Sequence, residues 1–276
     1  MVEIILEPLK YNFFIRGLLA GLIVSIACGV LSGFIVWRGM AFIGDALAHA
    51  ILPGIVIAVI LGANLLIGAL ISALVAVFGI GVFTRRKGFK EDTAIGVIFA
   101  GLFALGVLLI SKVGTFKDLS HILFGNILGV MEFDLLIIGI VGLVVVILIY
   151  FFYKELLVTS FDTTHAIAIG LSPLFIHFLL LVLIAVTTVI ATQTVGVILV
   201  LALLVTPAAT ASLLVRELNK IIWLSVLFSL LAIVMGFYIS YHLDLSSGAT
   251  IVLFLTGLFL IAYLKNLLGN LVSKNK

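Results

Sequence analysis

The sequence predicts an all-helical protein that crosses a membrane several times, as a polytopic bundle of eight or nine spans. Of its 276 residues, 64% are hydrophobic and 10% are charged, whereas a soluble domain has about 45–50% apolar and about 25% charged residues. This excess is too large for one buried core and fits a protein whose outer surface contacts lipid. The single cysteine, Cys28, excludes an intrachain disulfide and is expected to be a small buried side chain.

Nine apolar runs approach the length of about 20 residues that a bilayer requires. They lie at residues 14–37, 42–62, 64–83, 94–111, 134–153, 173–192, 194–215, 221–240 and 249–267. Run 42–62 is the doubtful one, because it holds Asp45, His49 and Pro53. The alternative is therefore eight full spans plus one broken or re-entrant segment. No linker marks a second domain, so residues 1–276 are expected to form a single transmembrane domain.

The distribution of lysine and arginine predicts the orientation of the spans. With nine spans and the N-terminus outside, eleven basic residues fall on the cytoplasmic side and four fall outside. The eleven are Arg38, Arg85, Arg86, Lys87, Lys90, Lys154, Arg216, Lys220, Lys265, Lys274 and Lys276. Basic residues concentrate on the cytoplasmic side of membrane proteins, so we expect the C-terminus inside, in a multi-pass protein surrounded by lipid.

Composition and missing motifs argue against several classes of function. The net charge of +3 is small and the basic residues do not gather on one face, which disfavours a nucleic-acid partner. The sequence has no GxxxxGK[ST] phosphate loop, no HExxH motif and no GxSxG nucleophile elbow. We therefore expect that this chain is not an enzyme and does not itself hydrolyse ATP by the phosphate-loop route.

Asp45 and His49 are the most informative pair of residues. They are four residues apart, so on a helix they share one face, one turn apart. An aspartate near the membrane centre costs about 2.5–3.5 kcal/mol and is expected to face a water-filled path or a partner. A carboxylate oxygen with an imidazole nitrogen suits Mn, Fe or Zn. The alternative is a structural hydrogen bond between Asp and His in packed helices.

Pro53 supports a path at this place, because proline lacks an N–H and leaves the carbonyl of His49 without its helical partner. We expect the helix to kink there and to present a free oxygen beside the imidazole. Unwound backbone of this kind is tolerated at membrane depth where it lines a cavity. Gly44 and Gly54 are expected to shape the path together with Pro53.

Three further acid–histidine pairs carry weaker signals. They are Asp118 with His121, Asp162 with His165, and His242 with Asp244. We interpret the first two as capping or solvated pairs and the third as residues of an external turn. His177 stands alone in an apolar run and is expected to be a packed histidine.

The segment 203–218 gives a second signal. Pro207 interrupts an apolar run and small residues follow it, which would allow close approach of another protein surface. We expect a membrane helix that bends into a short helix exposed in the cytoplasm; a proline-kinked span without a partner is the alternative. The residues concerned are Thr206, Pro207, Ala208, Ala209, Thr210, Ala211, Arg216 and Glu217.

Several long motifs, in order along nearly the whole chain, make the sequence resemble the manganese/zinc/iron class of ABC importer permeases. They are WRGMAFIGDALAHAILPGIVIA at 37–58, FKEDTAIGVIFAGLFALGVLLIS at 89–111, LSHILFGNILGV at 119–130, VGVILVLALLVTPAATASLL at 195–214 and YHLDLSSGATIVL at 241–253. The resemblance implies an ABC importer permease fold, in which a homodimer of permeases surrounds a central path. It also implies cytoplasmic ATPase subunits below and an extracytoplasmic solute-binding protein that delivers the metal from above.

The resemblance also assigns roles to residues. It implies that Asp45 and His49 line the path, and that the stretch from Thr206 to Ala211 with the helix after it couples to the ATPase. The expected function is the permease subunit of an ATP-driven importer of Mn, Zn or Fe, working by alternating access in a bacterial or archaeal cell (inner) membrane. The metal ion is the transported substrate, and no permanently bound cofactor is expected. The alternatives are a permease for a metal chelate of the siderophore or cobalamin kind, or an ATP-independent secondary metal carrier.

Overall fold

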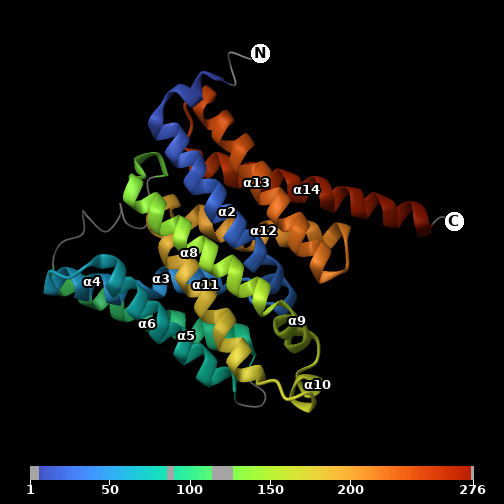
Figure 1. The fold of residues 1–276 in the computed structure, drawn as a ribbon, viewed down its shortest axis with the longest axis horizontal. Coiled ribbons are helices and arrows are strands. Elements are labelled where there is room, and N and C mark those ends of the chain that lie inside the picture. Colours follow the sequence, from blue (N-terminus) through green and yellow to red (C-terminus); the bar gives the residue numbers. More distant parts are fainter. Residues whose placement is uncertain (1–5, 86–89, 114–126, 275–276) are drawn as a thin grey trace.

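The computed structural model describes residues 6–85, 90–113 and 127–274, and all regular elements in these ranges are helices (Figure 1). The elements are η1 (Pro8–Lys10), α2 (Asn12–Arg38), α3 (Ile43–Ala50), α4 (Leu52–Leu61), α5 (Leu65–Thr84), α6 (Glu91–Val113), η2 (Ile127–Gly129), α8 (Glu132–Phe151), α9 (Tyr153–Phe161), α10 (Thr163–Ala168), α11 (Pro173–Val195), α12 (Val197–Leu214), α13 (Leu218–Leu243) and α14 (Ser247–Lys274). The predicted all-helical class is confirmed.

Nine helical stretches in the described ranges are long and apolar enough to cross a membrane, and they coincide with the nine predicted runs. Eight of them are continuous helices, whereas the second, Ile43–Leu61, is divided between α3 and α4 at Ile51. The division lies two residues before Pro53, whose ring nitrogen cannot donate to a preceding carbonyl. The predicted break in run 42–62 is therefore confirmed.

The segment around Pro207 differs from its prediction. α12 continues through Pro207 to Leu214 as one helix, and residues 215–217 turn directly into α13. The expected bend into a separate short helix is wrong, because a membrane helix tolerates an internal proline where neighbouring groups satisfy the freed backbone. Here the N–H of Ala208 donates to Ser32 Oγ of α2 at 3.2 Å.

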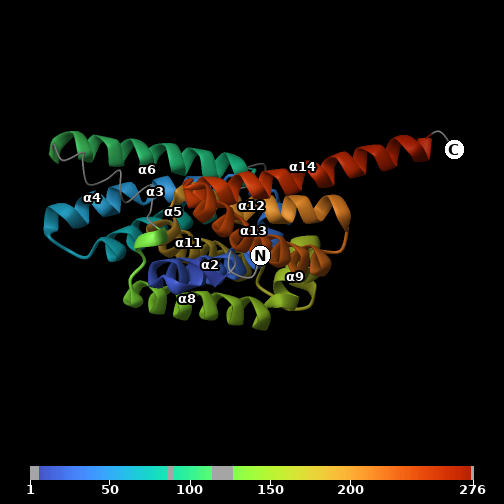
Figure 2. The same cartoon turned by 90° about the horizontal axis from the view of Figure 1, so that it is seen from above.

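The helices form two groups with α11 between them. α3, α4, α5 and α6 pack on one another, while α2 packs against α8, α12 and α13, and α14 covers α12 and α13. α11 contacts α5 and α3 on one side and α2, α8 and α12 on the other. Figure 2 shows α6 and α14 on one face of the molecule, α8 on the opposite face, and α2 and α11 in the interior. We call α3–α6 the first group and α2, α8, α9 and α12–α14 the second group.

Small residues bring the helices of the first group together. α4 and α5 cross so closely that a Cβ on Gly54 would overlap the carbonyl of Gly68, and the reverse is also true. A Cβ on Gly44 would lie 2.9 Å from Leu204 Cδ1 of α12. Close packing through small residues replaces the hydrophobic drive that lipid cannot supply. Gly44 and Gly54 thus set the distances between α3 or α4 and their neighbours.

One end of the bundle collects the basic residues. α2, α5 and α12 end there, α6, α11 and α13 begin there, and the short helices α9 and α10 cover it (Figure 1). The described basic side chains at this end include Arg38, Arg85, Lys154, Arg216 and Lys220. We call it the basic end. The orientation predicted from lysine and arginine makes it the cytoplasmic end.

Candidate functional site

Asp45 and His49 lie one turn apart on α3, as their spacing predicts. The imidazole Nδ1 of His49 is 3.0 Å from the backbone oxygen of Asp45 and 3.3 Å from the carboxylate Oδ1 of Asp45. The two side chains therefore form one polar step on one helix. The alternative of a hydrogen bond between two packed helices does not describe them.

The contacts of His49 determine which nitrogen is open. Nδ1–H donates to the backbone oxygen of Asp45, and this bond leaves the lone pair of the neutral ring on Nε2. Within the described residues, Nε2 has no hydrogen-bond partner. Metal-binding histidines have this arrangement, with one nitrogen held by a carbonyl or carboxylate and the other directed at the ion.

Packing holds the imidazole in place while leaving it partly open. The His49 ring meets the rings of Phe99 and Phe103 of α6 edge to face, with centroids 5.8 and 5.5 Å apart. The side chains of Asp45 and His49 nevertheless keep 41% and 30% of their surface exposed. This pair lies in an apolar span, yet it is partly exposed, and Nε2 of His49 has no hydrogen-bond partner among the described residues. The pair is therefore available to bind a ligand.

The backbone at the α3–α4 break does not present the expected oxygen. The carbonyl of His49 receives the N–H of Ile51, and the carbonyl of Ala50 accepts the hydroxyl of Ser72 at 2.7 Å. The expectation of a free carbonyl at His49 is therefore wrong, because residues at the break replace the donor that Pro53 lacks. A Cβ on Gly106 of α6 would lie 2.7 Å from Leu52 Cβ and 3.2 Å from Pro53 Cδ, so Pro53 shapes this place by packing on α6.

The pair supplies two donors for an ion. Among the described residues, no group of three or more histidine, cysteine, aspartate or glutamate side chains is placed to hold a metal. A carboxylate oxygen and an imidazole nitrogen suit a divalent transition ion, and the remaining positions would be filled by water or by a second chain. Weak, incomplete coordination is what a conduit requires, because the ion must also leave.

The other predicted acid–histidine pairs have separate roles. Asp118 and His121 lie outside the described residues. Asp162 caps α10, since Oδ1 accepts the N–H of Thr164 at 2.8 Å and of His165 at 3.0 Å. These backbone bonds, that of His165 first, lower the pKa of Asp162. The capping interpretation of this pair is confirmed.

The third pair lies in a turn, as predicted. Asp244 follows α13 in the left-handed conformation, with φ of 51°. His242 precedes it in the last turn of α13 and meets the ring of Tyr241 at 5.3 Å. Neither residue approaches Asp45 or His49 through a described contact. We find no second donor set here.

The residues predicted to contact an ATPase differ in accessibility. Pro207, Ala208, Thr210 and Ala211 are buried within α12. Arg216 and Glu217 are exposed in the turn that follows, and Glu217 Oε1 accepts from Lys220 Nζ at 2.7 Å. Of these residues, Arg216 and Glu217 are therefore the most accessible to another protein, whereas Thr206 and Ala209 are partly exposed.

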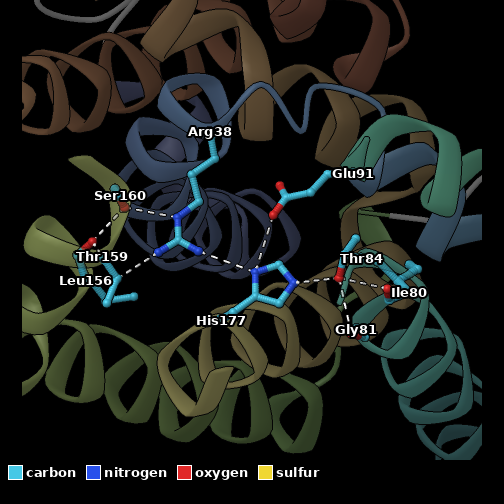
Figure 3. A network of polar contacts seen from close by, with 9 residues as sticks. All are labelled: Arg38, Ile80, Gly81, Thr84, Glu91, Leu156, Thr159, Ser160 and His177. Carbon is cyan, nitrogen blue, oxygen red and sulfur yellow. Dashed lines mark hydrogen bonds and ion pairs between the residues drawn. The ribbon is translucent and has the colours of Figure 1, made fainter. Parts of the chain in front are cut away.

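A second polar cluster lies at the basic end and was not predicted (Figure 3). We call it the Arg38 cluster; it consists of Arg38, Thr84, Glu91, Thr159, Ser160 and His177. Arg38, the last residue of α2, donates from Nε to Ser160 Oγ at 2.9 Å and from Nη2 to Thr159 Oγ1 at 3.1 Å. It thereby ties α2 to α9.

His177 of α11 lies at the centre of this cluster. Its Nδ1 is 3.4 Å from Arg38 Nη1 and 3.5 Å from Glu91 Oε1, and its Nε2 is 3.4 Å from Thr84 Oγ1 (Figure 3). His177 is packed, as predicted, but its polar partners were not predicted, because they arrive from helices distant in the sequence. No local pattern could have found them, since Arg38 and His177 are 139 residues apart.

The cluster borders a cavity of 720 Å³ at the basic end, lined also by Arg85, Thr163 and Pro173. Glu91 directs Oε1 to the imidazole, while its Oε2 is buried without a hydrogen-bond partner. A buried carboxylate oxygen without a donor is costly, so this cluster is only partly satisfied. Arg38 and Glu91, which carry opposite charges, both lie beside Nδ1 of the His177 ring.

A family model and the sequences of known proteins both match this chain over nearly its whole length. The model of the ABC 3 transport family matches residues 10–266. The chain is 45% identical, over 93% of its length and 91% of the relative, to the manganese transport system membrane protein MntC of Listeria monocytogenes. It is 42% identical, over 95% and 97%, to a probable iron transport system membrane protein of Haemophilus influenzae.

Solved structures agree with this. The chain superposes on a chain of PsaBC from Streptococcus pneumoniae, solved in complex with Fab, with a TM-score of 0.82, 41% identity and 95% of both chains covered. An inward-facing structure of a putative metal-chelate type ABC transporter matches with a TM-score of 0.73 at 14% identity, covering 91% of this chain and 85% of the other. The second likeness concerns the fold alone.

Proposed function

The chain belongs to the ABC 3 transport family, and from this premise we propose that it is the membrane-spanning permease subunit of an ATP-driven importer for a divalent transition-metal ion. The manganese and iron transport proteins that resemble it over more than nine-tenths of its length support this substrate class. Manganese, iron and zinc share the preference for oxygen and nitrogen donors. The metal is transported as substrate, without a permanently bound cofactor.

Asp45 and His49 form the step at which the ion is held in passage. The observation that carries this proposal is the open Nε2 of His49 beside a half-exposed carboxylate, on a broken apolar helix. The ion exchanges part of its water for the imidazole and the carboxylate. These two ligands fill only part of the coordination shell of the ion, so the ion can leave when the surrounding helices move.

Two copies of the chain complete the site. One chain offers a single aspartate and a single histidine on an open face of α3. A two-fold axis brings the same surface of each copy together, so it would place two carboxylates and two imidazoles around one path. This argument supports a homodimer, and it accounts for polar side chains left open in an otherwise apolar segment.

The basic end receives the ATPase. Arg216 and Glu217 are exposed in the turn after α12, and α9 and α10 lie at the same end of the bundle (Figure 1). The segment from Thr206 to Ala211 acts from within α12, where it fixes the position of that turn. ATP binding and hydrolysis by the separate ATPase subunits then drive alternating access, and this chain supplies no catalytic residue.

The partners on the other side follow from the same topology. Nine spans place the N-terminal end of α2 and the turn at Asp244 opposite the basic end. A solute-binding protein delivers the metal to that extracytoplasmic surface, in a bacterial or archaeal cell membrane. A chelate importer would need a wide apolar cavity without an acid–imidazole step, so the Asp45–His49 pair disfavours it. A secondary carrier would work without an ATPase, whereas membership of the ABC 3 transport family favours an ATP-driven importer.

The test is uptake of ⁵⁴Mn²⁺ into proteoliposomes that contain the permease and its ATPase. We expect Asp45→Asn and His49→Ala each to reduce uptake at least about tenfold, a loss of about 1.4 kcal/mol in transition-state or ion stabilisation. Thr256→Ala is the matched control, because this side chain is also polar and lies in an apolar span, but it donates to the carbonyl of Val252 on its own helix α14. Normal uptake by both path variants, with normal amounts of assembled complex, would remove Asp45 and His49 from the path.

A further inference from the structure

The division of the molecule into two helix groups raises the question of how movement reaches the ion step. Asp45 and His49 belong to the first group, on α3. The exposed elements of the basic end, α9 and the turn at 215–217, belong to the second group. A movement that an ATPase imposes on these elements must therefore pass from the second group to the first. One route is the direct packing of α3 on α11 and α12. The other is the set of polar contacts that joins α2, α9 and α11 to α5 and α6, which we call the seam.

The Arg38 cluster spans this seam. On one side, Arg38 is bonded to Ser160 and Thr159 of α9. On the other side, the imidazole of His177 is 3.4 Å from Thr84 Oγ1 of α5 and 3.5 Å from Glu91 Oε1 of α6. Arg38 Nη1 lies 3.4 Å from Nδ1 of the same ring. The imidazole thus links Arg38, which is hydrogen-bonded to α9, with Thr84 of α5 and Glu91 of α6 (Figure 3).

α6 continues the connection to His49. Glu91 is its first residue, and Phe99 and Phe103 follow eight and twelve positions later, about 12 and 18 Å along the helix axis. The rings of both phenylalanines contact the imidazole of His49, and Gly106 lies against Leu52 and Pro53 at the break. A displacement of the first turn of α6 is therefore carried to the ion step by closely packed side chains.

The imidazole of His177 has two hydrogen-bonded arrangements without any change in charge. In one, Nδ1 accepts from Arg38, which can only donate, and Nε2–H donates to Thr84 Oγ1. In the other, Nδ1–H donates to Glu91 Oε1 and Nε2 accepts from the Thr84 hydroxyl, which then gives up its bonds to the carbonyls of Ile80 and Gly81. The first arrangement favours α2 and α9, and the second favours α6. Two discrete arrangements are what a packed interface needs to switch between states.

We infer that Arg38, His177 and Glu91 are positioning residues that transmit the movement of α9 across the seam to α6, and through Phe99 and Phe103 to the imidazole of His49. The inference rests on the proposed function, since it concerns how ATP hydrolysis is linked to the ion step. These residues do not touch the ion. They set the number of ions imported for each ATP hydrolysed.

The experiment measures both quantities in proteoliposomes containing the permease and its ATPase. For Arg38→Gln and His177→Phe we expect Mn²⁺ imported per ATP hydrolysed to fall about tenfold, with ATP hydrolysis and Mn²⁺ binding retained. His177→Gln, which offers both a donor and an acceptor, should restore much of the ratio. Arg85→Gln is the matched control: it removes a basic side chain that lines the same cavity and does not contact the imidazole.

A purely structural role predicts a different result. It would lower the yield and melting temperature of the complex, while each surviving complex would import as many Mn²⁺ ions per ATP as the wild type. An unchanged ratio in Arg38→Gln and His177→Phe would therefore overturn the inference.

A second readout separates the inference from the proposed function. Spin labels at Val97→Cys on α6 and Lys154→Cys on α9 report the distance across the seam, and Cys28 is too buried to react. We expect a non-hydrolysable ATP analogue to change this distance in the wild type, and Arg38→Gln to abolish the change. Loss of Mn²⁺ uptake in the wild type would refute the proposed function alone, whereas a distance change that persists in Arg38→Gln would refute the coupling.

Discussion

The Asp45–His49 pair and the Arg38 cluster are both polar groups set into an apolar helix bundle, but they differ in how they are supported. His49 has one hydrogen-bonded nitrogen and one open nitrogen, and the two side chains keep 30% and 41% of their surface exposed. Arg38 uses three of its nitrogens on partners from two other helices. The Asp45–His49 pair keeps one open nitrogen and is held largely by packing, whereas the Arg38 cluster is held by hydrogen bonds between helices. Under the proposed function, this difference suits the pair to bind and release an ion, and the cluster to hold helices together and transmit their movement.

The largest effect on stability is expected from Arg38→Ala. Three buried or half-buried partners would lose a donor, and at about 0.5–1.5 kcal/mol for each hydrogen bond the total is about 1.5–4.5 kcal/mol. Asp45→Ala should change stability by less than about 0.5 kcal/mol, because its carboxylate is partly solvated and contacts its own helix. Thermal unfolding in detergent, followed by the fluorescence of Trp37 and Trp223, compares them. Equal destabilisation by Arg38→Ala and Asp45→Ala would contradict the claim that hydrogen bonds support the Arg38 cluster more strongly than the Asp45–His49 pair.

A smaller effect is expected where α6 packs on the broken helix. In Gly106→Ala the new methyl group would lie 2.7 Å from Leu52 Cβ, so the helices must separate at a cost of about 1–3 kcal/mol. Gly101→Ala is the control on the same helix, since nothing lies within 4 Å of its Cβ, and it should be neutral or stabilising by up to about 1 kcal/mol.

The same two variants sharpen the comparison through transport. Because α6 positions the His49 ring by contact alone, Gly106→Ala should also reduce Mn²⁺ uptake per assembled complex, while Gly101→Ala leaves it unchanged. If Mn²⁺ uptake in the two variants falls only in proportion to the loss of melting temperature, the packing of α6 contributes to stability and does not position the His49 ring.

The sequence predicts much of the fold because each apolar run is long enough to span the membrane alone. The nine runs appear as helices, and Asp45, His49 and Pro53 correctly identify the run that breaks. Local chemistry also predicts the cap at Asp162, whose oxygen needs only the next three residues. In these cases the deciding interactions lie within about one turn of the chain.

The structure departs from the sequence-based expectations for local and for distant reasons. The carbonyl of His49 was expected to be free, but Ile51, two residues further on, supplies an N–H. Pro207 was expected to bend its helix into a separate short helix, but α12 continues through it, and Ser32 of α2 accepts the N–H of Ala208. His177 is packed as expected, but its polar partners, which come from α2, α5 and α6, were not predicted. Tertiary contacts of this kind have no signature in a single sequence.

The account depends most on the open nitrogen of His49, and pulsed electron paramagnetic resonance of Mn²⁺ bound to the purified permease tests it directly. An imidazole that coordinates Mn²⁺ gives a nitrogen coupling in this measurement. We predict that the wild type shows the coupling, that His165→Gln retains it and that His49→Gln abolishes it. A nitrogen coupling of unchanged strength in His49→Gln would contradict the assignment of this histidine to the ion path.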